Sequence, residues 1–294
     1  MYDKNSKIGF IGLGTMGYPM AGHLAQQGYQ VSVYNRTPAK ATQWQAQYSG
    51  TSAKTPAELA QGMDIVFSCV GNDNDLRAVT IGEQGAFHTL APHAVFIDHS
   101  TTSADIAREL FSIAQAKGFH FLDAPVSGGQ SGAEKGILTV MVGGEAEIFA
   151  QVQPVISAYA KAVTLMGNAG MGQLTKMVNQ ICIAGLLQGL SEAVHFGEQA
   201  GLDMKLVLDV ISKGAAQSWQ MENRGKTMVD KAFNFGFAVD WMRKDLGLCL
   251  TEARQNGATL PITALVDQFY ADVQDKGGNR WDTSSLITRL TRKI

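Results

Sequence analysis

The first half of the chain alternates short apolar runs with segments of helical spacing. Continuous apolar runs of four to seven residues are typical of strands that are covered on both faces. Strands that alternate with helices predict right-handed crossovers and a doubly wound parallel sheet. The expected strands are 7–11, 31–34, 64–70, 94–98, 119–122 and 137–142, and the expected helices are 15–27, 37–47, 73–81 and 103–117.

The pattern changes after residue 167, where helical spacing continues and no strand-like run follows. Residues 171–200 predict one long helix, and the glycines of 167–170 before it are typical of a hinge. We therefore expect an α/β protein with a sheet domain over 1–167 and an all-helical domain over 168–294. The other helices that we expect there are 203–213, 238–255, 262–276 and 284–293.

Composition and charge narrow the class of protein. The chain has 294 residues, 45% of them hydrophobic, which is enough for two cored domains. Its net charge of -2 speaks against a nucleic-acid partner, which requires a basic excess. Charged residues make up 17%, against about 25% in typical proteins, so we expect surface to be buried between domains or between the subunits of a homodimer or homotetramer.

Cysteine usage and hydropathy indicate the compartment. The three cysteines, Cys69, Cys182 and Cys249, show no pairing pattern, as in reduced cytoplasmic proteins. The N-terminal segment is polar, and no apolar run is long enough for a membrane span. We expect a cytoplasmic protein without a membrane partner.

Glycine is unevenly distributed. The chain has 32 glycines, and 13 of them lie in three stretches, with four in 9–17, six in 128–144 and three in 167–172. Excess glycine marks backbone that takes a positive φ or approaches a ligand closely. These three stretches are therefore where we look for chemistry.

The first stretch contains a GxGxxG motif between an expected strand and an expected helix, which is the context of a Rossmann dinucleotide site. The first glycine permits the tight turn, the second lets the backbone approach the pyrophosphate, and the third lets helix pack on strand. The alternative is a glycine-rich turn without a ligand. The candidate cofactor residues are Gly12, Leu13, Gly14, Thr15, Met16 and Gly17.

The end of the second expected strand indicates which dinucleotide binds. NAD-binding proteins place an Asp or Glu there, but this chain has Asn35, Arg36 and Thr37. A guanidinium can hold a 2′-phosphate with several donors, so we expect NADP(H), with NAD(H) also possible. The alternative is a solvated surface arginine.

At the beginning of the second stretch lies Ser127-Gly128-Gly129, which follows the strand expected at 119–122. Its N–H groups and hydroxyl could form a nest for a carboxylate at the carboxyl edge of the sheet. A turn before the next strand explains the same residues equally well.

The third stretch leads into the long helix, where Lys176, Asn179 and Gln180 share one face. A lysine beside two amides, entering an apolar helix, suggests a site. A solvated lysine is an equally good interpretation from the residues alone.

With these motifs the chain resembles the β-hydroxyacid dehydrogenases, which include 3-hydroxyisobutyrate dehydrogenases and the tartronate, glyoxylate and succinic semialdehyde reductases. The resemblance covers nearly the whole chain. It rests on residues 9–17, 123–129, 170–180 and 244–246. It implies hydride transfer between NADP(H) and a small β-hydroxy acid or semialdehyde.

The resemblance also implies roles for particular residues. Lys176 would be the catalytic acid/base, because hydride transfer to a carbonyl leaves an alkoxide that needs a proton. Many members have a second asparagine at the position of Gln180, so this chain departs from them there. With Asn179-Gln180 it resembles the tartronate semialdehyde reductases. The implied substrate residues are Ser127, Gly128, Gly129, Asn179, Gln180, Phe237 and Asp245, and the further cofactor residues are Val70, Gly71, Asn72, Thr101 and Lys244.

Three other interpretations remain. The chain also resembles 6-phosphogluconate dehydrogenase, a decarboxylating enzyme, but that family has His-Asn at the place of Asn179-Gln180. Imine reductases resemble the end of the second strand but generally lack the lysine. A non-catalytic dinucleotide sensor would keep the glycine loop without needing Lys176. The six histidines show no ligand spacing, so we expect no metal site.

Overall fold

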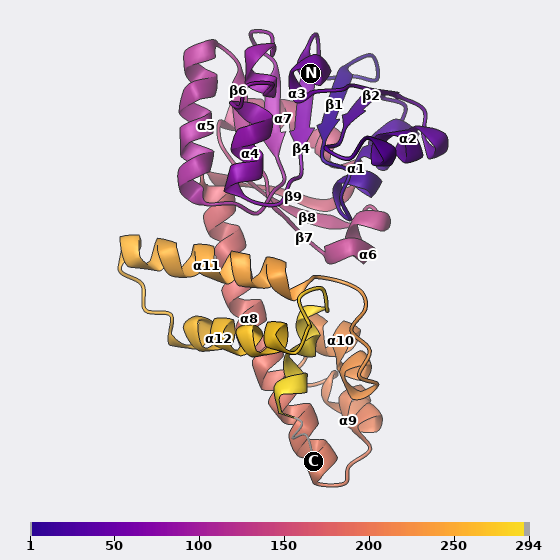
Figure 1. Cartoon of the computed structure of the whole chain (residues 1–294), viewed down its shortest axis with the longest axis vertical. Coiled ribbons are helices and arrows are strands. Elements are labelled where there is room, and N and C mark those ends of the chain that lie inside the picture. The colour runs from indigo at the N-terminus through magenta and orange to yellow at the C-terminus, as the bar shows by residue number, and fades with distance from the viewer. Residues whose placement is uncertain (1, 291–294) are drawn as a thin grey trace. The chain divides into compact units, whose positions relative to one another are not determined.

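The computed structural model describes residues 2–290. Their contacts divide the chain into two compact units, Met1–Lys176 and Met177–Ile294. The first unit contains the sheet and the second is helical (Figure 1). Among the described residues, no helix is long and apolar enough to cross a membrane. The division that we expect between residues 167 and 168 concerns folding domains and stays a prediction.

The sheet confirms the doubly wound class. Its strand order is β3-β2-β1-β4-β5-β6-β8-β7, with β9 also paired to β8, and its first six strands are parallel as in a Rossmann fold. The pairing becomes antiparallel between β6 and β8. The strands are β1 Lys7–Ile11, β2 Gln30–Tyr34, β3 Thr51–Ser52, β4 Ile65–Ser68, β5 Val95–Asp98, β6 His120–Asp123, β7 Val126–Ser127, β8 Leu138–Gly143 and β9 Ala160–Gly167.

Both faces of the sheet are covered because alternate strand residues point to opposite sides. Phe10 and Phe67 belong to the core beneath one helical layer, whereas Ile11 and Val66 belong to the core beneath the other. The first layer contains α1 Gly17–Gln26, α2 Pro38–Gln47, α6 Gly129–Glu134 and α7 Ala146–Ile156. The second contains α3 Pro56–Ala60, α4 Asp73–Thr80, the 3₁₀ turn Ala86–His88 and α5 Ala104–Lys117.

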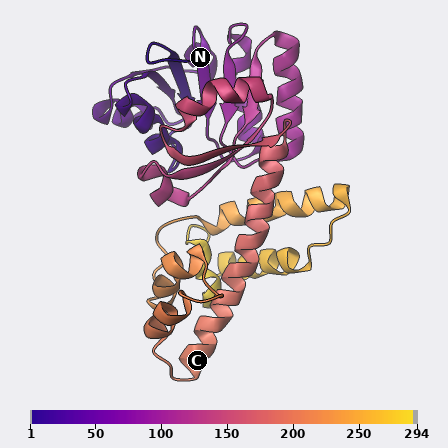
Figure 2. The ribbon, with the colours of Figure 1, turned by 180° about the vertical axis from the view of Figure 1, so that it is seen from behind.

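The helical unit is built on α8, Met171–Gln199, which begins in the first unit. In Figure 2 the pair α11 and α12 lies beside this helix, and Leu187, Met242 and Tyr270 form their common core. Val194 and Leu208 belong to a second core, beside α9 and α10. The remaining elements are α9 Met204–Ile211, α10 Trp219–Val229, α11 Val239–Asn256, α12 Pro261–Asp275 and a 3₁₀ helix, Thr283–Arg289.

Several elements differ from the expectations. Strand β9 was not foreseen because it is largely half-exposed and mixes polar with apolar residues, and helix α7 contains an internal Pro154. The helix expected at 284–293 is wrong in type: a 3₁₀ helix forms, in which the Asp282 side chain bonds the amide and hydroxyl of Ser284. Residues 291–293 of that expectation lie outside the described part. The other unforeseen elements are β3, β7, α3, α6, α10 and the 3₁₀ turn Ala86–His88.

Candidate active site

The glycine loop between β1 and α1 has the geometry that its motif requires. Gly12 has a φ of +95°, and a side chain there would strike the Cys69 carbonyl. A Cβ on Gly14 would meet no atom within 4 Å, so its backbone is accessible to a ligand. A Cβ on Gly17 would strike the Gly12 carbonyl and the Phe10 ring, so only glycine lets the helix pack on the strand. The loop fits a dinucleotide pyrophosphate.

Asn35 and Arg36 at the end of β2 have different surroundings. The Leu13 N–H donates to Asn35 Oδ1 at 2.9 Å, and Asn35 Nδ2 donates to the Thr37 carbonyl at 3.1 Å, so Asn35 ties the glycine loop to β2. Arg36 is 84% exposed and lies 2.9 Å from the carboxylate of Asp75 on α4. Sequence reasoning missed Asp75, since nothing along the chain links positions 36 and 75.

The other predicted cofactor residues of the first unit follow β4 and β5. Asn72 caps α4 by accepting the Asp75 N–H at 2.9 Å, and the Val70 N–H donates to Ser100 Oγ at 2.8 Å. Thr101 is half-buried beside Ser100. Since parallel strands end at one edge, the sheet brings these segments and the glycine loop to the same edge.

A buried polar cluster lies beneath this edge. Asp98 at the end of β5 accepts hydrogen bonds from the hydroxyls of Ser68 and Ser100 at 2.6 and 2.7 Å. Burial raises the pKa of Asp98 to about 7. His99 bonds the Ala124 carbonyl and the Tyr159 hydroxyl, and burial lowers its pKa to about 4.

Asp123 at the end of β6 connects the sheet to α8. Its carboxylate accepts the N–H groups of Gly170 at 2.7 Å and Gln173 at 2.9 Å, which is a favourable place for an anion at a helix start. A Cβ on Gly172 would strike the Met141 carbonyl and this carboxylate, so the site requires glycine. Lys176 follows one helical turn after Gln173 and is only 7% exposed.

Ser127, Gly128 and Gly129 form the turn between β7 and α6. The two glycines have φ angles of +132° and +61°, which most other residues avoid, and a Cβ on Gly129 would meet no atom within 4 Å. This geometry leaves both the anion nest and the plain turn open.

The helical unit holds its predicted residues through side chains. The Asn179 amide donates to Gln180 Oε1 at 2.8 Å, and Gln180 Nε2 donates to Asp245 Oδ2 at 2.6 Å. Lys244 Nζ lies 3.0 Å from Asp245 Oδ1. Gln180 and Asp245 are almost fully buried, so they orient Asn179 and Lys244. Phe237 is half-buried, and its N–H donates to Asp282 Oδ2 at 2.9 Å.

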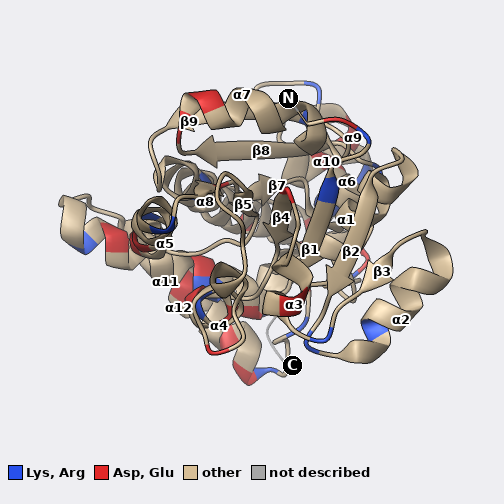
Figure 3. Cartoon of the chain, turned by 90° about the horizontal axis from the view of Figure 1, so that it is seen from above, with Lys and Arg blue, Asp and Glu red and all other residues tan. Residues whose placement is uncertain are grey.

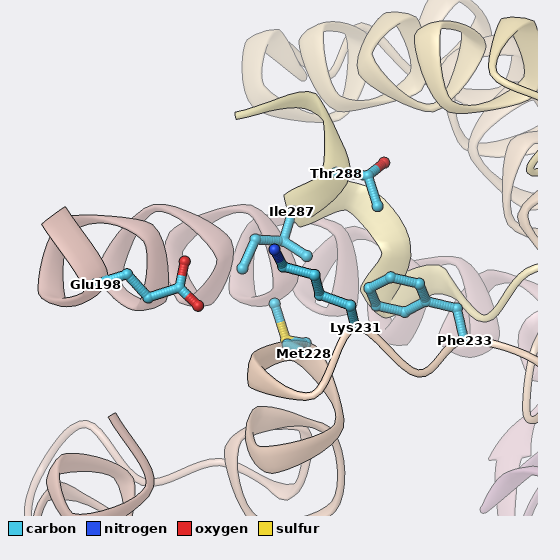
Figure 4. Close-up of a pocket in the computed structure, with 6 residues that line it drawn as sticks. All are labelled: Glu198, Met228, Lys231, Phe233, Ile287 and Thr288. Atoms are coloured by element: carbon cyan, nitrogen blue, oxygen red, sulfur yellow. The ribbon is translucent and has the colours of Figure 1, made fainter. Parts of the chain in front are cut away.

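The remaining surface offers less specific features. Figure 3 shows acidic and basic positions interspersed over the helices of the first unit, as the small net charge suggests. No group of three or more His, Cys, Asp or Glu residues able to hold a metal ion occurs among residues 2–290. A hollow in the helical unit contains no predicted site residue (Figure 4); it is lined by Glu198, Met228, Lys231, Phe233, Ile287 and Thr288.

Family models match both parts of the chain. Residues 7–167 match the NAD-binding domain of 6-phosphogluconate dehydrogenase. Residues 170–290 match the NAD-binding domain of NADP-dependent 3-hydroxyisobutyrate dehydrogenase. Together the two models define an NAD(P)-dependent oxidoreductase.

Individual relatives match over nearly their full lengths. An uncharacterized oxidoreductase of Shewanella frigidimarina is 62% identical over 98% of this chain and 99% of its own. The 2-hydroxy-3-oxopropionate reductase of Escherichia coli is 34% identical over 97% of both chains. The structure of Mycobacterium tuberculosis 3-hydroxyisobutyrate dehydrogenase with L-serine has a TM-score of 0.88 at 29% identity, covering 98% of this chain and 100% of its own. The chain belongs to the 3-hydroxyisobutyrate dehydrogenase-like, or β-hydroxyacid dehydrogenase, family of oxidoreductases.

Proposed function

We propose that this protein interconverts a small β-hydroxy acid and its semialdehyde with NADP(H), using Lys176 as general acid and base. The observation that carries the proposal is the start of α8. There Asp123 bonds the helix backbone, and the buried Lys176 follows one turn later. A family member with a buried lysine so close to the ligand edge of its sheet has the group that carbonyl reduction needs.

The residues divide the chemistry between them. When bound, the nicotinamide supplies the hydride for the carbonyl carbon. The Lys176 ammonium stabilises negative charge on the carbonyl oxygen and donates a proton to it; in the reverse direction the neutral amine accepts that proton. Asn179 hydrogen-bonds a substrate oxygen, and Gln180 contributes to the substrate site by orienting Asn179. The turn Ser127–Gly129 holds the carboxylate.

The cofactor assignment rests on the end of β2. Arg36 is exposed and has no carboxylate next to it in sequence, and a 2′-phosphate would compete with the Asp75 carboxylate 2.9 Å away for its guanidinium. The description of the matching C-terminal family, NADP-dependent, supports the same choice. Lys244 is assigned to the cofactor as well, while Phe237 and Asp245 shape the substrate site.

The names of the relatives support a class of substrate. The E. coli relative is named for 2-hydroxy-3-oxopropionate. This chain has Asn179-Gln180, the pair by which it resembles tartronate semialdehyde reductases. We therefore favour a three- or four-carbon semialdehyde acid. We also propose a cytoplasmic homodimer or homotetramer, supported by three cysteines that form no disulfide and by the low charge content.

Steady-state kinetics test the proposal. The panel contains the tartronate, methylmalonate and succinic semialdehydes, glyoxylate and 6-phosphogluconate, each assayed with the NADP and the NAD form of the cofactor. We expect reduction of a small semialdehyde with NADPH. Turnover of 6-phosphogluconate with release of CO₂ would instead identify a decarboxylating enzyme, and NADPH binding without any turnover would identify a sensor.

A further inference from the structure

Gln173 is a fully buried polar residue to which neither the motifs nor the resemblance assigns a role. Its side-chain amide contacts the backbone between β5 and α5. Nε2 donates to the Ser100 carbonyl at 2.8 Å, and the Thr102 N–H donates to Oε1 at 3.1 Å. The amide thus bonds the chain on both sides of Thr101.

The backbone of Gln173 is itself fixed to the sheet. Its N–H donates to Asp123 Oδ2 at 2.9 Å, and the neighbouring Gly172 packs so closely on Met141 and Asp123 that an added Cβ would strike both. Gln173 therefore links the end of β6 to the segment after β5 at a defined place. A link of this kind transmits a displacement because buried, well-packed groups have few alternative arrangements.

The linkage continues to the segment after β4. Ser100, whose carbonyl Gln173 holds, also accepts the Val70 N–H at 2.8 Å and donates its hydroxyl to Asp98 at 2.7 Å. Two segments assigned to the cofactor are thus connected to the first turn of α8. Lys176 lies three residues after Gln173, one turn along the same helix.

We propose that Gln173 is a positioning residue, which holds Thr101 and the adjoining part of the cofactor site in register with Lys176. This rests on the proposed function, because it takes Thr101 as a cofactor contact and Lys176 as the proton donor. The physical reason for the expected effect is that displacement of reacting groups by about 1 Å costs on the order of 100-fold in rate.

The first test compares two variants with a matched control. Gln173→Leu keeps the approximate size and removes both hydrogen bonds, and Gln188→Leu makes the same change on a half-buried glutamine of the same helix. We expect kcat to fall about 30- to 100-fold in Gln173→Leu, while the Kd for NADPH changes less than about threefold because the glycine loop is untouched. Gln188→Leu should keep kcat within about twofold. A Gln173→Leu kcat near wild type, or equal losses in both variants, overturns the proposal.

Gln173→Glu provides a readout that loss of folding cannot mimic. A protonated glutamic acid can donate to the Ser100 carbonyl, whereas a carboxylate cannot, and burial favours the protonated form. The ratio of its kcat to that of wild type should therefore rise as the pH falls from about 8 to 6. A ratio that is independent of pH contradicts the proposal. This outcome can be read even if Gln173→Leu does not fold.

A hydrogen-exchange measurement distinguishes failure of this proposal from failure of the proposed function. The Thr102 amide should exchange about tenfold faster in Gln173→Leu than in wild type and be unchanged in Gln188→Leu, because its acceptor is lost. If wild type reduces none of the acids, the proposed function fails, and this measurement alone decides whether Gln173 holds the segment. Unchanged exchange in Gln173→Leu would show that it does not.

Discussion

The two units hold their predicted site residues in different ways. In the sheet unit, side chains bond the backbone: Asn35 holds the glycine loop, Asp123 holds the start of α8, and Gln173 holds the chain beside Thr101. In the helical unit, the predicted residues on helices are joined side chain to side chain, from Asn179 through Gln180 to Asp245, and only Phe237, before α11, is held through its N–H, by Asp282. Loops at a sheet edge need side chains to bond their backbone N–H and C=O groups. Helices already satisfy these groups internally, so their side chains are free to orient one another.

The largest effect should come from Lys176, which lies on α8 one turn after the residues whose backbone Asp123 holds. Lys176→Ala should lower kcat by about 1000-fold, because general acid catalysis and charge stabilisation at the oxyanion are both lost. The Kd for NADPH, measured by fluorescence titration, should change little. Lys161→Ala on β9 is the control with the same loss of charge at an exposed position. A Lys176→Ala kcat within tenfold of wild type would show that another group transfers the proton.

The buried pair Asp98 and His99 should produce the next largest effect, on stability instead of rate. The pKa of Asp98 is raised from 3.8 to about 7, so the stability it contributes is complete below pH 4 and is lost as the pH rises through 7. The pKa of His99 is lowered from 6.5 to about 4, so its contribution is complete above pH 6.5 and is lost as the pH falls through 4. In wild type the two trends oppose each other between pH 4 and 6.5.

Single substitutions should expose these opposite slopes. With Asp98→Asn, the free energy of unfolding should increase relative to that of wild type as the pH rises from 4 to 6.5, by the order of a few kcal/mol. With His99→Gln, it should fall relative to that of wild type over the same interval. Urea unfolding at several pH values measures both, with wild type and the exposed-site variant His88→Gln as references. Parallel slopes in all four proteins would contradict the assigned shifts.

Much of the sheet unit could be predicted because its elements follow local patterns. Strands β1, β2, β4, β5 and β6 are short, mostly apolar segments, and the glycine motif requires a strand before it and a helix after it. Strand β9 could not be predicted, because it pairs with β8 at one side and its own residues are half-exposed. A context-dependent strand of this kind has no period of its own.

The candidate site was predictable only where a residue type signals its chemistry. Lys176 and the glycines belong to recognisable motifs, while Gln173 and Asp75 become apparent only when distant segments meet. One partial signal existed: Asp98 and Asp123 each end a buried strand, where an acidic residue is unusual unless it has a role. Their partners still depend on tertiary structure.

Asp245 tests the other side of the comparison, where side chains hold side chains. Asp245→Asn keeps the shape but removes the charge that faces Lys244 and weakens the acceptor for Gln180. We expect kcat/KM to fall by about 30-fold, since a buried charged hydrogen bond is lost and Asn179 is less well oriented. Asp272→Asn, at a half-exposed ion pair with Arg289, is the matched control and should change kcat/KM by less than twofold. If both variants behave like wild type, the hydrogen bonds from Asn179 through Gln180 to Asp245 have no part in the reaction.

The smallest effect concerns Arg36 and Asp75, which form an exposed pair at the sheet edge. Arg36→Ala should raise the Kd for NADPH about tenfold and leave the Kd for NADH within twofold, because only NADPH carries the phosphate that the guanidinium would bind.

Asp75→Asn should lower the Kd for NADPH about two- to threefold at low salt, since it removes a carboxylate that competes for Arg36 and repels the phosphate. This gain should disappear at 0.5 M salt, where such charges are screened. In the double variant Arg36→Ala/Asp75→Asn, the remaining effect of Asp75→Asn reports only the repulsion, so the difference between the two backgrounds measures the competition for Arg36. Equal Kd values for NADPH and NADH in wild type would remove the basis for both expectations and would leave Arg36 as a surface residue.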